Sequence, residues 1–139
     1  MAVETVMSGE IFLIGRILFA GMLAFMALPH FIKLGSYKEY AGAKDVPLPK
    51  IAVLTSGGVL LTGSIMILTG IKIPVAAILL LIFFIIVTPK MHDFWNEEDP
   101  EQKQQELFHF QKNVVMTGAV ILILAISIQQ WPLSLEALL

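Results

Sequence analysis

The chain has 139 residues, of which 57% are hydrophobic and only 14% are charged, and its formal net charge is −2 at pH 7. Soluble domains are usually about 45–50% apolar and about 25% charged, so this composition predicts one integral membrane domain over residues 1–139. The chain has no basic run to neutralise phosphates, which excludes nucleic acid as a partner. It has no cysteine, which excludes disulfide exchange and iron–sulfur ligation by cysteine within this subunit.

The first apolar segment predicts a membrane span over about residues 11–34, long enough to cross a hydrocarbon core of about 30 Å. Arg16 lies near its start, and Ala20, Ala24 and Ala27 follow it at helical spacing. This spacing produces a narrow face of small residues that suits close packing against another helix. A polar connector over residues 35–50 separates this span from the next one.

A second span is predicted over about residues 51–70 and a third over about residues 74–91. The link between them is too short for anything but a tight hairpin, and Pro74 suits the first turn of the third span. The two spans must therefore be antiparallel neighbours. Thr55, Thr62 and Thr69 recur on one side of the second span, where hydroxyl side chains commonly join helices within membranes.

The last helix has a strong start signal, because Asp99 can cap its N-terminus and Pro100 suits its first turn. Its first turns, over about residues 100–106, are expected to stand in water before a fourth span over about residues 107–128. The sequence therefore predicts an all-α, up-and-down bundle of four transmembrane helices. An apolar tail over residues 133–139 is expected to lie on the membrane interface.

The basic residues predict the orientation of this bundle. Seven of the nine cations lie in or beside the two long connectors, whereas Lys72 and Arg16 lie toward the opposite side. Cytoplasmic loops carry an excess of lysine and arginine, so both connectors are expected in the cytoplasm and both termini outside the cell membrane. The seven cations are Lys33, Lys38, Lys44, Lys50, Lys90, Lys103 and Lys112.

Polar side chains gather at the cytoplasmic boundary of the predicted spans, and they are the first candidates for chemistry. The set comprises His30, His92, Asp93, His109 and Asn113. Imidazole and carboxylate groups at such a boundary could hold a quinone headgroup, relay protons or dock a soluble partner. The alternative is that they are interfacial residues that hydrogen-bond loop backbone and water. The histidines lack the close spacing of a metal-binding pair, so no metal site is predicted.

Three further polar residues, Arg16, Thr62 and Thr117, are predicted within the membrane. Arg16 must either reach lipid headgroups or find an acceptor, and the candidate acceptors are Glu10, Thr69 and backbone carbonyls freed by the tight hairpin. Thr62 and Thr117 are expected to join helices rather than to line a transport path.

A series of short motifs runs through residues 11–128. They are Gly15-Arg16, His30-Phe31, Val46-Pro47-Leu48-Pro49, Gly57-Gly58 with Gly63, Thr88-Pro89 with Met91-His92-Asp93-Phe94-Trp95, and Phe110-x-Lys112-Asn113 with Gly118. Together they resemble the DoxX family. The resemblance implies a four-helix membrane protein linked with quinol oxidation or thiosulfate:quinone oxidoreduction. Many relatives carry a glutamate just before the paired glycines, where this chain has Thr55 and Ser56.

The resemblance implies a membrane subunit of a quinone-linked redox assembly, with quinone as the expected ligand. The chain has no redox centre of its own, so a redox partner subunit is expected, and an activity of the subunit itself, as part of an oxidoreductase, stays open. The alternative is a non-enzymatic scaffold or a small-solute carrier. A proton-coupled carrier usually keeps an ionisable residue near the bilayer midplane, and none occurs between Arg16 and His30 on the first span. The small faces of the first two spans also permit a homo-oligomer.

Overall fold

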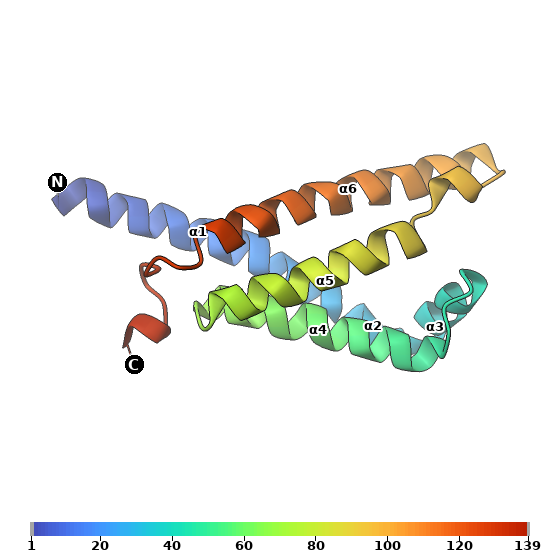
Figure 1. Cartoon of the computed structure of the whole chain (residues 1–139), viewed down its shortest axis with the longest axis horizontal. Helices are drawn as coiled ribbons and strands as arrows, with labels where there is room; N and C mark the ends of the chain where they lie inside the picture. The colour runs from blue at the N-terminus through green and yellow to red at the C-terminus, as the bar shows by residue number, and fades with distance from the viewer. Residues whose placement is uncertain (1, 139) are drawn as a thin grey trace.

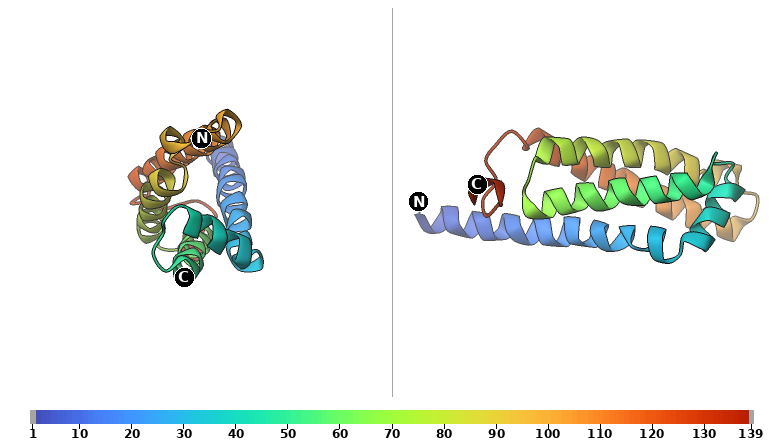
Figure 2. Two further views of the ribbon diagram at one scale, coloured as in Figure 1. Left: turned by 90° about the vertical axis from the view of Figure 1, so that its right-hand side faces the viewer. Right: turned by 90° about the horizontal axis from the view of Figure 1, so that it is seen from below.

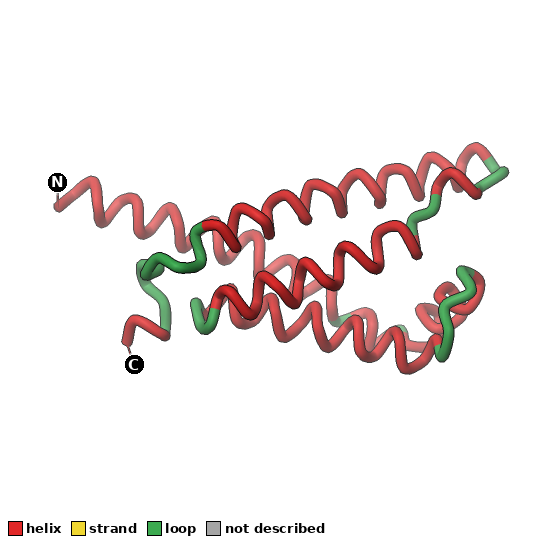
Figure 3. The backbone as a smooth tube through the Cα atoms, in the orientation of Figure 1, coloured by secondary structure: helices red, strands yellow, loops and turns green. Residues whose placement is uncertain are grey.

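The computed structural model describes the backbone of residues 2–138 and the side chains of residues 8–138, and its regular secondary structure is helical (Figure 3). Among these residues, four helices are long and apolar enough to cross a membrane, which confirms the predicted all-α membrane fold. They are α1 (Ala2–Ala27), α4 (Pro49–Thr69), α5 (Ile73–Met91) and α6 (Pro100–Ala125). The shorter elements are α2 (Pro29–Ile32), α3 (Leu34–Ala43) and two 3₁₀ turns, η1 (Phe94–Asn96) and η2 (Glu136–Leu138).

The long helices run up and down, and each packs mainly on its neighbour in a row. α4 lies between α1 and α5, and α6 packs on the other side of α5 (Figures 1 and 2). Both chain termini lie at one end of the bundle, which we call the terminal end. The opposite end holds α3, η1 and the start of α6, and we call it the connector end.

The core is built from the small-residue faces that the sequence indicates. Ala20 and Ala27 of α1 are fully buried, as are Ala76 and Ala77 of α5. Small side chains let helix backbones approach closely, which is the main source of helix association in lipid. Larger apolar side chains fill the space between them, chiefly Leu23, Leu60, Ile67, Leu80, Phe84 and Val120.

Two glycines of α4 mark its closest contacts. A Cβ atom added at Gly63 would lie 2.9 Å from the Leu80 side chain of α5, and one at Gly57 would lie 2.5 Å from the Cβ of His30. Real Cβ atoms essentially never come this close, so both positions require a residue without a side chain. Gly58, next along the chain, faces open space.

The structure adds two features to the predicted architecture. The connector expected over residues 35–50 is largely helical, because α3 folds there and buries Ala41 against α4. α1 also begins near the start of the chain, at Ala2 rather than near residue 11. Neither helix segment has a strong apolar period that would have marked it in the sequence.

Gly57→Ala is expected to destabilise the protein, because the added methyl group must displace His30 from its contact with α4. Overpacking of this kind typically costs about 1–3 kcal/mol. The matched control is Gly58→Ala, which meets no neighbour within 4 Å and should be neutral or stabilising by up to about 1 kcal/mol, since alanine favours helix. Thermal unfolding of both variants in detergent checks this, and equal melting temperatures would contradict it.

Candidate functional site

The connector end brings together two of the three histidines that the sequence singles out. His92 follows directly after α5, His109 lies on α6, and their rings stack with centroids 5.2 Å apart. Asp93 adjoins His92 along the chain. Asn113 lies one helical turn beyond His109 and is 6% exposed. The site is thus formed where α5 ends and α6 passes beside it.

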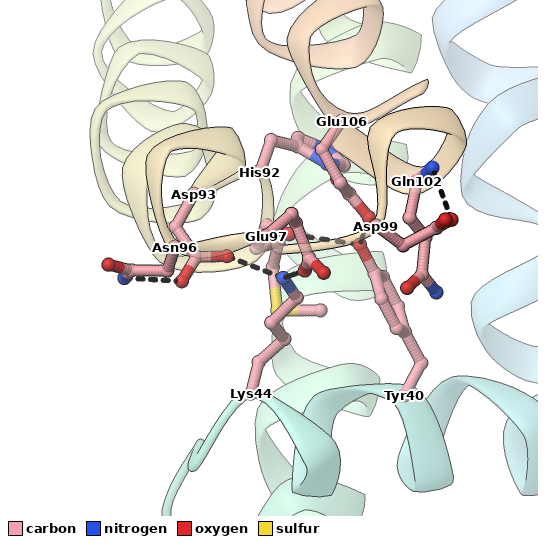
Figure 4. A network of polar contacts seen from close by, with 10 residues as sticks. Tyr40, Lys44, His92, Asp93, Asn96, Glu97, Asp99, Gln102 and Glu106 are labelled. Carbon is pink, nitrogen blue, oxygen red and sulfur yellow. Dashed lines mark hydrogen bonds and ion pairs between the residues drawn. The ribbon is translucent and has the colours of Figure 1, made fainter. Parts of the chain in front are cut away.

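Glu106, a buried carboxylate of α6 that is only 8% exposed, connects this histidine pair to α3. Its Oε2 lies 2.8 Å from Nδ1 of His92, and its Oε1 accepts a hydrogen bond of 2.7 Å from the hydroxyl of Tyr40 (Figure 4). The same hydroxyl lies 2.9 Å from the carbonyl oxygen of Met91. Burying a carboxylate is costly unless its oxygens are hydrogen-bonded, and here both of them are.

Lys44, at the end of α3, forms a second set of ionic contacts beside the first. Its ammonium group binds the carboxylates of Asp93 and Glu97, the latter at 2.6 Å. Asn96 donates to the other oxygen of Asp93 at 2.9 Å. All three charged side chains are largely buried, so their attraction is screened less than that of a surface pair. Lys44 therefore fastens α3 to η1 (Figure 4).

The contacts at the end of α3 change the acid–base behaviour of Tyr40 and Lys44. Burial lowers the pKa of Lys44, but its hydrogen bonds and charge interactions with Asp93 and Glu97 outweigh burial and raise it overall. Burial and the hydrogen bond to Glu106 raise the pKa of Tyr40 well above its usual range. At physiological pH Lys44 is thus a cation, and Tyr40 is a neutral phenol that donates its proton.

Local folding explains why α6 presents Glu106 here. Asp99 caps the helix by accepting a hydrogen bond of 3.0 Å from the backbone amide of Gln102, and Pro100 occupies the first turn, as predicted. The start fixed by this cap sets the rotation of the whole helix. Glu106 and Asn113 are seven residues apart and both buried, so they lie on the face turned toward α5.

A cleft of about 510 Å³ opens beside these groups. Its polar lining comes from Tyr40, Lys44, Lys90, Asp93, Glu97 and Glu106, among others. An aromatic cluster of Phe94, Trp95 and Phe110 lies on the same η1–α6 junction, with the Phe94 and Phe110 rings 5.4 Å apart. Trp95 is half exposed, as expected of rings at a membrane boundary. Within the described part of the chain, no three His, Asp or Glu side chains are grouped to hold a metal ion.

His30 lies apart from this network. Its ring contacts Tyr37 at a centroid distance of 4.9 Å and Phe83 at 6.5 Å, and its Cβ fits against Gly57. These neighbours belong to α3, α5 and α4. His30 therefore contributes to packing between the helices rather than to the contacts around Glu106.

Arg16 is buried at the terminal end, where it binds backbone carbonyls. Its Nη1 donates to the Pro132 carbonyl at 2.8 Å, and its Nη2 donates to the carbonyls of Leu68 at 2.8 Å and Leu133 at 3.2 Å. Leu68 lies in the last turn of α4, whose carbonyls have no partners within the helix and carry partial negative charge. The acceptor is thus of the kind predicted at the hairpin. The ring of Trp131 covers the guanidinium at 5.8 Å.

The two threonines differ in position. Thr62 is exposed on the surface of α4, so the predicted threonine face is not turned into the core. Thr117 is half-buried, and its hydroxyl donates to the carbonyl of Asn113 in the preceding turn at 2.8 Å. Neither residue approaches the Glu106 network.

Comparison with known proteins identifies the family. A family model described as DoxX matches residues 11–93, which is more than half of the chain. The chain belongs to the DoxX family. The match takes in Tyr40, His92 and Asp93 but ends before α6, which supplies Glu106 and His109. Searches of curated proteins and of solved structures find no significant match for this DoxX protein.

The structure also locates the glutamate that many DoxX relatives are expected to carry at position 55 or 56. This position adjoins Gly57, which contacts His30, and it lies about 18 Å along α4 from Leu68, the residue that binds Arg16. A carboxylate at either position would be remote from the terminal end. It would not pair with Arg16, so the change to Thr55 and Ser56 leaves the Arg16 contacts intact.

Sequence reasoning did not include Tyr40, Lys44, Glu97 or Glu106 among the candidate site residues. Tyr40 and Lys44 lie more than 40 residues before their partners, so nothing local in the sequence connects them. Glu106 did carry a signal, because it lies on one helix face with His109 and Asn113.

Lys44→Met is expected to reduce stability by about 1–3 kcal/mol, between the values for surface and buried ion pairs. Because the pKa of Lys44 is raised on folding, its contribution is complete below the usual lysine pKa of about 10.5 and is lost as pH rises through the higher folded value. The difference in melting temperature between wild type and Lys44→Met should therefore be constant from pH 7 to 9 and shrink above about pH 10.5. A difference that is already lost by pH 9 would refute the proposed strength of this contact.

Arg16→Met is expected to destabilise the protein by about 2–4 kcal/mol, because three carbonyl oxygens lose a charged donor. It should also release the segment around Trp131, which can be followed by Trp131 fluorescence in a Trp95→Phe background. Arg16→Lys keeps the charge with fewer directed donors and should recover part of the stability. Unchanged stability and emission in Arg16→Met would show that Arg16 does not hold this segment.

Proposed function

We propose that this DoxX protein is the membrane subunit of a quinone-linked redox assembly, and that its connector end binds a quinone headgroup. The observation that carries this proposal is the buried Glu106 carboxylate, held by Tyr40 and His92 at the boundary of the membrane-spanning helices. A quinone headgroup needs polar partners for its two oxygens, and its isoprenoid tail needs lipid close by. A polar group at the end of a transmembrane bundle meets both requirements.

The residues at this end suit an aromatic ligand of that kind. Tyr40 and the histidines supply hydrogen-bonding groups, and the cluster of Phe94, Trp95 and Phe110 supplies ring surfaces beside them. Aromatic rings stack in offset or edge-to-face geometry with a useful gain in free energy. In the proposed assembly the connector end faces the cytoplasm, both termini lie outside the cell membrane, and a partner subunit with its own redox group exchanges electrons with the bound quinone.

A second candidate function is that of a scaffold that docks a soluble protein. Glu98, Asp99 and Glu101 are exposed around the start of α6, and none of them pairs with Lys44 among the described contacts. On this alternative, Glu98→Lys with Glu101→Lys prevents assembly, whereas substitution of His92 leaves it unchanged. On the quinone proposal the ranking is reversed.

The test is thermal unfolding of the purified protein with increasing concentrations of duroquinone. A ligand that binds only the folded state stabilises it by about 2.7 kcal/mol at a hundredfold excess over its Kd. Wild type should show a saturable rise in melting temperature that His92→Ala abolishes. The matched control is Gln105→Ala, an exposed position next to Glu106 on α6. This variant should retain the rise in melting temperature.

Two results would overturn the proposal. One is the absence of any rise in wild type at concentrations up to the solubility limit of duroquinone. The other is a rise of equal size in wild type and His92→Ala, which would place quinone binding away from the connector end.

A further inference from the structure

The contacts of His92 leave one ring nitrogen for a ligand. Nδ1 faces Oε2 of Glu106 at 2.8 Å. A carboxylate only accepts hydrogen bonds, so Nδ1 must carry the proton of this contact. Among the described residues, the ring of His92 is hydrogen-bonded through Nδ1 alone, which leaves Nε2 free. Any polar bond between His92 and a bound ring must therefore use Nε2.

We propose, on the basis of the quinone-binding function above, that Glu106, held by Tyr40, is a positioning residue. Its contact with Nδ1 leaves Nε2 as the atom of His92 that binds the ligand, and the protonation state of Nε2 then selects the redox form of that ligand. With Nε2 protonated, His92 donates to a carbonyl oxygen of the oxidised ring. With Nε2 unprotonated, His92 accepts a hydrogen bond from a hydroxyl group of the reduced ring. One atom thus discriminates between quinone and quinol.

Tyr40 makes this arrangement rigid. Its single hydroxyl proton lies within reach of two acceptors, Oε1 of Glu106 at 2.7 Å and the Met91 carbonyl at 2.9 Å. Both acceptors are close to His92: Glu106 contacts its ring, and Met91 precedes it in the chain. The phenol therefore fixes the second oxygen of Glu106 and the backbone at the end of α5 together. Second partners of this kind set the tautomer and orientation of a histidine ring.

The arrangement of charged groups around His92 favours Glu106 as the group that affects the protonation of its ring. Glu106 is the carboxylate that contacts the ring, while the neighbouring carboxylates of Asp93 and Glu97 are both ion-paired with Lys44. His109 stacks on a face of the His92 ring and is exposed to solvent. The titratable and charged groups around His92 are Tyr40 and Lys44 of α3, Lys90 of α5, Asp93 and Glu97 of the η1 segment, and Glu106, His109 and Lys112 of α6.

The inference predicts opposite pH dependences for the two redox forms. Above the pH at which Nε2 loses its proton, affinity for the quinone should fall tenfold per pH unit, because each bound quinone requires one proton on Nε2. Below it, affinity for the quinol should fall by the same factor. Plots of log Kd against pH for the two forms should therefore cross.

The experiment measures Kd for duroquinone and for its hydroquinone under anaerobic conditions from pH 5 to 9, using wild type, Glu106→Gln and Gln105→Ala. Glu106→Gln keeps an acceptor for Nδ1 but removes the negative charge that stabilises the imidazolium, so the crossing point should move to lower pH. The exposed Gln105→Ala control should match wild type. Nitrogen NMR of the histidine-labelled protein should show His92 protonated at Nδ1 in its neutral form.

Three outcomes separate the inference from the function on which it rests. Parallel pH dependences for the two forms in wild type, or a neutral His92 protonated at Nε2, would overturn the inference while leaving quinone binding intact. An unmoved crossing point in Glu106→Gln would likewise overturn the assigned role of Glu106. Absence of binding of both forms to wild type at every pH would instead overturn the proposed function. The wild-type measurements decide the matter even if a variant fails to fold.

Discussion

The burial of Glu106 is the constraint on which the connector end depends. A carboxylate removed from water must be hydrogen-bonded at both oxygens, and its partners here come from α3 and from the end of α5. Three segments that are distant in sequence are therefore held in one arrangement by a single side chain on α6. Removing either partner would leave one oxygen of the buried carboxylate without its hydrogen bond, so the group favours one specific arrangement of the three segments.

The buried charged side chains at the two ends of the bundle have different kinds of partner. At the connector end, ionisable groups meet one another: Lys44 pairs with Asp93 and Glu97, and Glu106 contacts His92. At the terminal end, the hydrogen-bond partners of Arg16 among the described residues are neutral carbonyl oxygens. The Leu68 carbonyl stands at the negative end of the α4 dipole, so a helix terminus serves in place of a carboxylate. Titratable partners, and with them the capacity for proton chemistry, are thus concentrated at the connector end.

The sequence predicted the parts of this structure that depend on local pattern. Apolar segment length gave the four spans, Pro74 and the short link gave the antiparallel hairpin, and Asp99 gave the start of α6. It did not reveal α3, whose helix is stabilised by burial of Ala41 against α4 rather than by its own periodicity. The contact between Tyr40 and Glu106 spans 66 residues and is created by folding, so no spacing rule could reveal it. Thr62 belongs to the threonine repeat of the second span, which is typical of a packed helix face, yet it is exposed. A helical repeat shows which residues share a face but not which face meets a neighbouring helix.

The contacts of Arg16 also bear on how the chain enters the bilayer. Two of its three acceptors, the carbonyls of Pro132 and Leu133, lie 116 and 117 residues further along the chain, so they do not exist when the ribosome delivers Arg16 to the membrane. Until residues 132 and 133 are made, the guanidinium lacks two of its three acceptors, and long basic side chains in that situation reach toward water and lipid headgroups. The full set of Arg16 contacts therefore forms only after α6 has been made, when the segment that follows α6 packs against α1.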